Sequence, residues 1–159
     1  MSEPNATGTV TVLAEADTVY ALVSDPGVLA ELSEEYAGFS WLNGATEATV
    51  GARFRGRNQR GVRRWSTVST VTETVPGRLF AFDVTFLGLP ISRWRYDLEP
   101  AEDGCVVTES TWDRRPAWLR LPTGLATGVM NRAEQNTANI AATLRRLKAR
   151  AEGTAGVGT

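Results

Sequence analysis

Apolar residues in the last third of the chain recur at helical spacing. Between residues 123 and 152 their separations are mostly three, four or seven, which places them on one side of an α-helix. The members of this stripe are Leu125, Val129, Ala133, Ile140, Leu144 and Leu147. Thr123 suits the N-cap position and Gly153 suits the C-terminal end of such a helix. The pattern therefore predicts one long amphipathic helix over residues 123–152.

Residues 7–116 carry shorter patterns that are typical of strands joined by tight turns. They predict seven strands, over residues 7–14, 38–42, 51–60, 64–75, 79–86, 91–98 and 105–112. Two short helices are predicted between the first two strands, one beginning near Asp17 and one running from Val28 to about Tyr36. Pro116 and Pro122 bracket a predicted loop before the long helix. Short turns favour antiparallel neighbours, so the order predicts an α+β fold in which a curved seven-stranded antiparallel sheet wraps around the C-terminal helix.

The strand over residues 51–60 separates its two faces clearly. Phe54 and Asn58 share one face, and Arg53, Arg55 and Arg57 share the other, which is therefore expected to meet water. Further arginines surround the following turn at positions 60, 63 and 64. Such a cluster suits binding to an acidic protein, an acyl-carrier protein or nucleic acid. Surfaces that bind single strands also carry exposed aromatic residues, and none alternates with these arginines. The pattern favours a solvated outer face of the sheet over these partners.

Composition limits the class of protein. A chain of 159 residues with a formal charge of −1 is long enough for one domain and lacks the basic excess of a dedicated nucleic-acid-binding protein. The sequence shows no signal-type apolar segment and no run of 18 apolar residues. We therefore expect a cytoplasmic protein that does not bind nucleic acid and is not stably inserted in a membrane.

The chain contains no histidine and only one cysteine, Cys105. A histidine-based catalytic triad and a histidine-ligated metal site are therefore excluded, and no metal or cofactor is expected. Any proton transfer must use a carboxylate, a tyrosine, a lysine, an arginine-assisted water or the thiol. Cys105 precedes two valines in a predicted strand, which favours a buried, unreactive thiol.

Five segments resemble a known family: VTVLAEADTVYALVSDP, GARFRGRNQRG, RWSTVSTVTETVPGRLFAFDV, ISRWRYDLEP and GCVVTESTWDRRP. With the order of the predicted elements, they resemble the START-like, helix-grip fold of the SRPBCC superfamily, in its polyketide cyclase/dehydrase and lipid-transport branch. The resemblance covers about Thr7 to Glu152. It implies one domain over residues 7–152, and we expect a flexible N-terminus over residues 1–6 and a disordered tail over residues 153–159.

The resemblance implies a cavity between the sheet and the long helix that holds an apolar or aromatic ligand. The family shares this cavity and no common set of catalytic residues, so no reaction is implied. Candidate ligand-binding residues are Phe54, Asn58, Trp65, Phe80, Phe82, Phe86, Trp94, Tyr96, Trp118, Leu125 and Val129. For most of the aromatic side chains, plain core packing is the alternative. Asn58 suits either a ligand carbonyl or hydroxyl, or a loop hydrogen bond at the sheet edge.

Glu109 and Tyr96 are the candidate catalytic residues. Glu109 alternates with Cys105 and Val107, which resembles the inward register of the family's last strand. An inward carboxylate would lose water, and its pKa would rise unless an arginine paired with it. A raised pKa is what a general acid or base requires. The alternatives are a structural ion pair or an outward side chain, because a shift of one residue in register exchanges the two faces.

The apolar segment from Pro116 to Gly128 enters the long helix. In this fold such a segment lies near the cavity mouth, so we expect it to control ligand entry. The alternative is that Trp118 fills the end of the core. Replacement of Trp118 by alanine would separate the two, because only gating predicts a changed rate of ligand association.

Three functions are compatible with the sequence. The first is a carrier or sensor that binds a lipid, polyketide or aromatic metabolite in the cavity. The second is a cofactor-independent polyketide cyclase, aromatase or dehydratase in which Glu109 or Tyr96 moves protons. The third is a regulatory module that acts through protein contact and would have a filled cavity. A homodimer or a contact with an acyl-carrier protein fits the first two.

Overall fold

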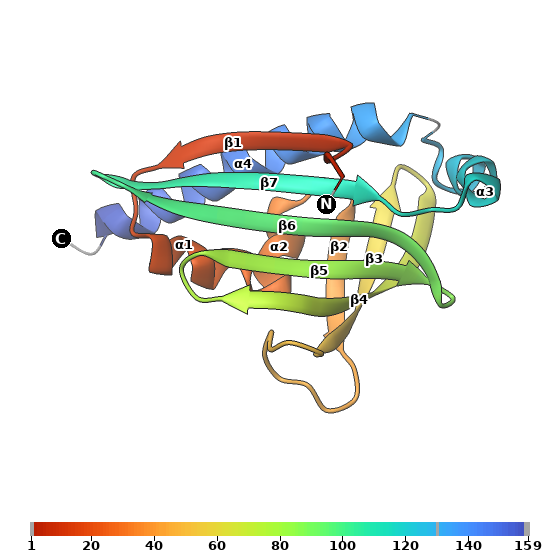
Figure 1. Ribbon diagram of the computed structural model, residues 1–159, viewed down its shortest axis with the longest axis horizontal. Coiled ribbons are helices and arrows are strands. Elements are labelled where there is room, and N and C mark those ends of the chain that lie inside the picture. The colour runs from red at the N-terminus through yellow and green to blue at the C-terminus, as the bar shows by residue number, and fades with distance from the viewer. Residues whose placement is uncertain (1, 130, 158–159) are drawn as a thin grey trace.

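A seven-stranded antiparallel sheet curves around the long C-terminal helix in the computed structural model, which describes residues 2–129 and 131–157 (Figure 1). The strands are β1 (Ala6–Val12), β2 (Tyr36–Trp41), β3 (Arg53–Arg60), β4 (Arg63–Val75), β5 (Leu79–Phe86), β6 (Leu89–Ala101) and β7 (Gly104–Asp113). The helices are α1 (Ala16–Val23), α2 (Pro26–Leu32), α3 (Ala117–Thr127) and α4 (Arg132–Val157). The predicted α+β helix-grip architecture is confirmed.

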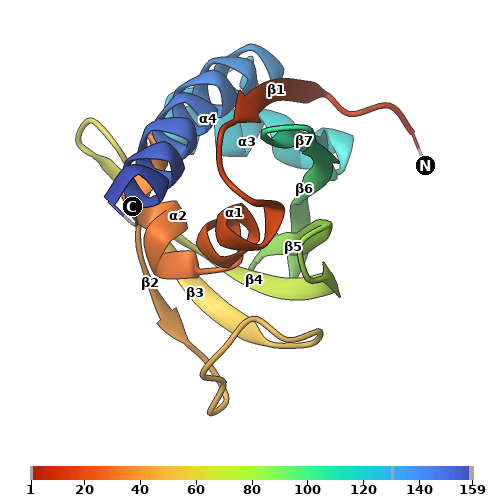
Figure 2. The ribbon, with the colours of Figure 1, turned by 90° about the vertical axis from the view of Figure 1, so that its left-hand side faces the viewer.

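The sheet has the strand order β1-β7-β6-β5-β4-β3-β2. Each strand from β2 to β6 is paired with the next strand along the chain, whereas β1 pairs with the last strand, β7. Figure 2 looks along the strands and shows the sheet as an arch whose open side, between β1 and β2, is closed by α4. Helices α1 and α2 close one end of this arch, and α3 lies at the other end (Figure 1).

The dense part of the core lies at the end that α1 and α2 close. Val19 and Val23 of α1 and Leu147 of α4 are fully buried there, together with Phe80 of β5 and Cys105 of β7. Strand β1 approaches α4 so closely that a side chain at Gly8 would collide with Ile140. The thiol of Cys105 is buried as expected, and burial raises its pKa.

The prediction of one unbroken C-terminal helix from Thr123 is wrong. Gly128 has a φ of 78°, a left-handed conformation that ends α3, and α4 begins only at Arg132. Thr123 therefore lies within α3 and is not an N-cap, and Pro122 lies within the same helix where a loop was expected. The break is accompanied by a change of direction that moves α3 off the axis of α4 (Figure 1).

Other boundaries differ less. The second short helix ends at Leu32, and Tyr36 begins β2, where a helix to about Tyr36 was predicted. At the C-terminus α4 continues past Gly153 to Val157, so glycine does not end the helix at this position. Residues 158–159 of the predicted disordered tail lie outside the described residues. None of the described helices combines the length and hydropathy needed to cross a bilayer.

Candidate functional site

A cavity of about 250 Å³ lies between the curved sheet and α4, at the end of the arch away from α1. Its volume is near the lower end of the range for small-molecule sites, which is about 300–1,000 Å³. Strands β3 to β7 supply one side, and Asn136, Ile140 and Thr143 of α4 supply the other. Thr123 and Thr127 of α3 complete the lining near the mouth.

Aromatic rings make up much of the sheet side of the cavity. Phe54, Trp65, Phe82, Trp94 and Tyr96 all line it, each from a position that faces inward on its strand. The ring of Phe54 also packs edge-on against Phe39 and Trp41 of β2, and at a tilt against Phe82. These contacts hold the rings in fixed positions, so the cavity has a preformed, largely apolar wall.

The structure brings eight of the twelve predicted site residues to the cavity. They are Phe54, Asn58, Trp65, Phe82, Phe86, Trp94, Tyr96 and Glu109. Asn58 donates a hydrogen bond to Thr67 Oγ1 at 3.2 Å and still lines the cavity, so it is not held by a loop.

The other four predicted residues lie elsewhere. Phe80 is fully buried at the α1 end, where its ring meets Tyr20 and Phe82. Val129 is buried in the connection between α3 and α4. Trp118 and Leu125 are 65% and 64% exposed on the outer side of α3, so the alternative that Trp118 fills the end of the core is wrong. The helix break explains the difference for Leu125, because it removes this residue from the stripe of α4.

Glu109 and Tyr96 form a hydrogen-bonded pair inside the protein. They lie opposite each other on β7 and β6, and the Tyr96 hydroxyl donates to Glu109 Oε1 at 2.7 Å. Both side chains are about 3% exposed, and Glu109 Oε2 makes no hydrogen bond with any described group of the protein. Burial raises the pKa of Glu109 to about 8, although the hydrogen bond from Tyr96 lowers it. Of the alternatives that the sequence left open, the structure has the inward, desolvated carboxyl, and no arginine among the described residues pairs with it.

This environment determines what Glu109 can do chemically. Near neutral pH the carboxyl is mostly protonated, because a charged form would lose its hydration without gaining a cation. Since Oε1 already accepts from Tyr96, the acid proton belongs on Oε2, the atom with no protein partner. Glu109 can thus donate a hydrogen bond or a proton to an oxygen of a molecule in the cavity. Burial also raises the pKa of Tyr96 well above its ordinary value, so this hydroxyl remains neutral.

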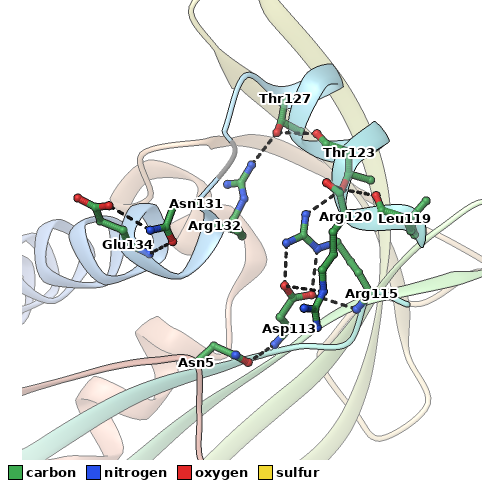
Figure 3. A network of polar contacts seen from close by, with 10 residues as sticks. All are labelled: Asn5, Asp113, Arg115, Leu119, Arg120, Thr123, Thr127, Asn131, Arg132 and Glu134. Carbon is green, nitrogen blue, oxygen red and sulfur yellow. Dashed lines mark hydrogen bonds and ion pairs between the residues drawn. The ribbon is translucent and has the colours of Figure 1, made fainter. Parts of the chain in front are cut away.

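Two arginine–carboxylate pairs form the rim between the cavity and α3. Figure 3 shows the first pair, Arg115 with Asp113, and the contact of Arg132 with Thr127. Arg115 binds Asp113 in bidentate fashion, with bonds of 2.7 and 2.9 Å, and also donates to Thr123 Oγ1 at 2.8 Å. Burial alone would raise the pKa of Asp113, but hydrogen bonds from Arg115 outweigh burial and lower it. The Thr123 hydroxyl accepts this bond from inside α3, so the pair ties the helix to the end of β7.

The second pair ties α3 to α4. Arg132 binds Glu35 at 2.8 Å, and Arg132 Nη2 donates to Thr127 Oγ1 at 2.9 Å. Asn139 adds a hydrogen bond of 3.1 Å to the same carboxylate. Thr123 and Thr127 are one helical turn apart, so both hydroxyls lie on the side of α3 that faces the rim. Helix α3 is therefore held over the mouth by two charge-assisted hydrogen bonds.

Sequence comparison assigns the family. Residues 3–152 match the family described as polyketide cyclase / dehydrase and lipid transport. The chain belongs to this family. The resemblance noted in the sequence is thereby confirmed, and it covers almost the whole chain. Among curated proteins, no relative with significant similarity is found.

Solved structures of family-like proteins share the fold. The Polyketide_cyc-like protein Cgl2372 from Corynebacterium glutamicum is 30% identical, with a TM-score of 0.61 over 93% of this chain and 91% of that one. The di-domain ARO/CYC protein StfQ from the steffimycin biosynthetic pathway is 17% identical, with a TM-score of 0.73. BexL, a di-domain ARO/CYC protein from the BE-7585A pathway, is 21% identical, with a TM-score of 0.68. The match covers 94% and 92% of this chain, which spans about half the length of these two di-domain proteins (51% and 49%).

Within this family member, the rim pairs and the polar residues of α4 are the site residues that sequence reasoning missed. Asn136 and Thr143 are buried, line the cavity and make no side-chain hydrogen bond to a described residue. They flank Ile140 at spacings of four and three, so they occupy the buried stripe of the helix. Polar residues at buried helical positions were a usable signal of a cavity. The pair of Arg132 and Glu35 had no such signal, because its partners are 97 residues apart.

Loss of the two rim hydroxyls is expected to loosen α3. The double variant Thr123→Val and Thr127→Val removes both hydrogen bonds from the arginines, each of which contributes about 1 kcal/mol. We expect a bound aromatic dye to associate and dissociate roughly tenfold faster, as measured by stopped-flow tryptophan fluorescence. Thr137→Val is the matched control, because Thr137 is an exposed threonine of α4 that bonds only to its own helix. Unchanged rates in the double variant would show that α3 does not limit access.

Proposed function

We propose that the protein binds a hydrophobic small molecule, such as a lipid, polyketide or aromatic metabolite, in the cavity between the sheet and α4, and acts as a carrier or sensor. The observation that carries this proposal is an unfilled volume of about 250 Å³ inside a wall of fixed aromatic rings. Close packing is the rule in protein interiors, so a preformed apolar volume of this size indicates a guest. An interior filled by side chains would instead have favoured the third function, a regulatory module that acts through protein contact.

The polar groups of the cavity suggest the shape of the ligand. Tyr96 and Glu109 lie deeper than Trp94, toward Phe80 and the end closed by α1. Asn136 and Thr143 add hydrogen-bonding groups from α4. The ligand we propose is a flat molecule that stacks on Trp65 and Trp94 and carries a carbonyl or hydroxyl oxygen at its inner end. Membership of a polyketide cyclase/dehydrase and lipid-transport family supports this chemical class.

The proposal is tested on protein purified from its own host under native conditions. Native mass spectrometry is expected to show an added mass that is released on denaturation, and extraction would identify it. The emptied protein is then titrated with a hydroxyanthraquinone, a flat carbonyl-bearing probe, and quenching of Trp65 and Trp94 fluorescence is followed. Saturable quenching would support the proposal. Absence of both the added mass and the quenching would rule out the carrier function.

A second candidate function is favoured by Glu109 itself. A protonated carboxyl with a free oxygen beside a neutral tyrosine suits a cofactor-independent cyclase, aromatase or dehydratase, in which it would protonate a ligand oxygen or accept its proton. The StfQ and BexL proteins, which carry the ARO/CYC designation, share this fold.

Three further expectations stay predictions: contact with an acyl-carrier protein, contact with a second copy of the chain, and location in the cytoplasm.

The two candidates respond differently to substitution of Glu109. A carrier keeps most of its affinity for the probe in Glu109→Gln, because the amide preserves a hydrogen-bond donor at the same place. An enzyme loses turnover in Glu109→Gln, because an amide cannot transfer the proton, while binding persists. Tyr96→Phe also lowers turnover, because the carboxyl loses the hydrogen bond that orients it. Turnover is assayed with a reduced polyketide-like ketone as substrate, and wild-type levels in both variants would eliminate the catalytic candidate.

A further inference from the structure

Exposed apolar side chains gather around the cavity mouth. Of the nine large apolar residues that are exposed among the described residues, six lie on three segments. They are Val62 in the turn between β3 and β4, Phe86 and Leu87 at the turn between β5 and β6, and Trp118, Leu121 and Leu125 on α3. Figure 1 shows α3 and both turns at the same end of the molecule, which we call the mouth end.

Helix α3 exposes its apolar side to solvent, unlike an ordinary surface helix. Trp118, Leu121 and Leu125 are spaced by three and four residues and are 58–65% exposed, so they form an apolar outer stripe. The hydroxyls of Thr123 and Thr127 bond to the rim arginines on the other side. A surface helix normally presents its polar side to water, and this one presents its apolar side. Exposed patches of this kind mark interaction sites.

The mouth end is also positively charged. Arg63 and Arg64 adjoin Val62 and make no ion pair with any described residue, and Arg60 bonds only to the neutral Gln135. Arg120 extends from the exposed part of α3. The nearby carboxylates of Asp83, Asp113 and Glu35 are each occupied by an arginine.

Charge is therefore distributed unevenly over the surface. The whole chain carries a formal charge of −1, so a basic end implies acidic surface elsewhere. Of the other carboxylates, Glu134 bonds to Asn131 at the start of α4, and Glu34, which lines the cavity, is paired with Arg146. Arginines beside exposed tryptophan and leucine are complementary to a surface that is anionic outside and apolar beneath.

We propose that the mouth end docks on an anionic phospholipid bilayer, with the apolar stripe of α3 and the two turns entering the headgroup region. The apolar side chains lie on three separate segments, and of the six only Phe86 also lines the cavity, so the patch suits a soft lipid surface better than a folded protein. Tryptophan favours the interface between water and hydrocarbon, and arginines bind lipid phosphates. Docking at this end places the cavity mouth against the lipid.

The proposal is tested by flotation of the protein with vesicles, without any cavity ligand. Vesicles of phosphatidylcholine alone are compared with vesicles of equal parts phosphatidylcholine and phosphatidylglycerol. The wild type is expected to float with the anionic vesicles only. The double variant Arg63→Gln and Arg64→Gln should bind about thirtyfold more weakly, because each arginine near an anionic surface contributes roughly fivefold. The triple variant Trp118→Ser, Leu121→Ser and Leu125→Ser should bind roughly a hundredfold more weakly.

Matched controls lie at the opposite end of the molecule. Leu13 directly follows β1, and Arg78 lies in the turn between β4 and β5; both segments are at the end opposite α3 (Figure 1). Both side chains are exposed, and neither Arg78→Gln nor Leu13→Ser is expected to change flotation. Thermal unfolding of every variant checks that the fold is retained. Failure of the wild type to float, or equal losses in the control variants, would overturn the proposal. Binding of the same surface to an acidic acyl-carrier protein, with no binding to vesicles, would also overturn it. Because no cavity ligand is present, these outcomes are independent of the proposed carrier function.

Discussion

The Glu109→Gln variant is expected to be more stable than the wild type above pH 8, by about 3 to 5 kcal/mol, and equally stable near pH 4. Glu109 is buried, its pKa is raised from 4.5 to about 8, and its carboxyl forms no ion pair with a described residue. Ionisation therefore costs free energy in the folded state and not in the unfolded state. The glutamine side chain cannot ionise and still accepts the hydrogen bond from Tyr96, so it removes only this cost.

The direction follows from proton binding in the two states. Below pH 4.5 the carboxyl is protonated in both states, and its full contribution to stability is present. Between pH 4.5 and 8 the folded state retains a proton that the unfolded state has lost, so the free energy of unfolding falls as the pH rises. Above the folded-state pKa of about 8 both states are ionised and the loss is complete.

Urea unfolding of both proteins between pH 4 and 9 measures the difference. The wild-type curve should diverge downward from that of Glu109→Gln across this range, and other titrating groups cancel in the comparison. Glu102→Gln, an exposed glutamate in the turn between β6 and β7, is the control and should follow the wild type. Parallel curves for wild type and Glu109→Gln would mean that the carboxyl ionises normally and is hydrated in the folded protein. The variant is expected to fold, so any loss of turnover in it reports on chemistry.

The Ser69→Phe variant is expected to lose binding of the hydroxyanthraquinone probe by at least about a hundredfold. Ser69 is a small, buried residue of β4 that lines the cavity, and its neighbours across the sheet are Phe54 on β3 and Val84 on β5. A benzyl group there would project into the space that the ligand needs. Because the cavity receives the added ring, we expect a change in the free energy of unfolding of only about 1 to 2 kcal/mol.

The matched control is Ser66→Phe. Ser66 lies three residues earlier on the same strand and is exposed on the opposite face, so the same substitution leaves the cavity open. Fluorescence titration gives the affinity of each variant for the probe, and circular dichroism verifies folding. If Ser69→Phe bound the probe as well as Ser66→Phe does, the ligand site would have to lie outside this cavity.

The order of the strands and the inner face of each could be predicted from the sequence, because both depend on local patterns. Side chains alternate across a strand, so Phe54 and the arginines beside it could be assigned to opposite faces from their positions alone. The same rule grouped Glu109 with Cys105 and Val107, and the family resemblance indicated that they face inward, but only the structure decided that Glu109 is buried. Short turns then left few ways to connect the strands, and the resemblance to a known family indicated the cavity.

The position of α3 at the rim of the cavity depends on tertiary contacts that no local sequence pattern encodes. The stripe that began at Leu125 had the spacing of one helix, but Gly128 takes a left-handed φ of 78° and divides it into α3 and α4. This break is stabilised by contacts distant in sequence, such as that between Arg132 and Glu35. It turns Trp118 and Leu125 outward and brings Thr123 and Thr127 to the rim.

By itself, the sequence determined the class of fold and the inner face of each central strand, because these depend on the period of side chains along the backbone. The tertiary structure alone decided that Tyr96 donates to Glu109, that Phe80 belongs to the filled end of the core, and that a cavity remains at the other end. Whether facing surfaces interlock or leave a void depends on the curvature of the sheet and the direction of α3. Both are set by contacts between distant segments, which periodicity along the chain does not record.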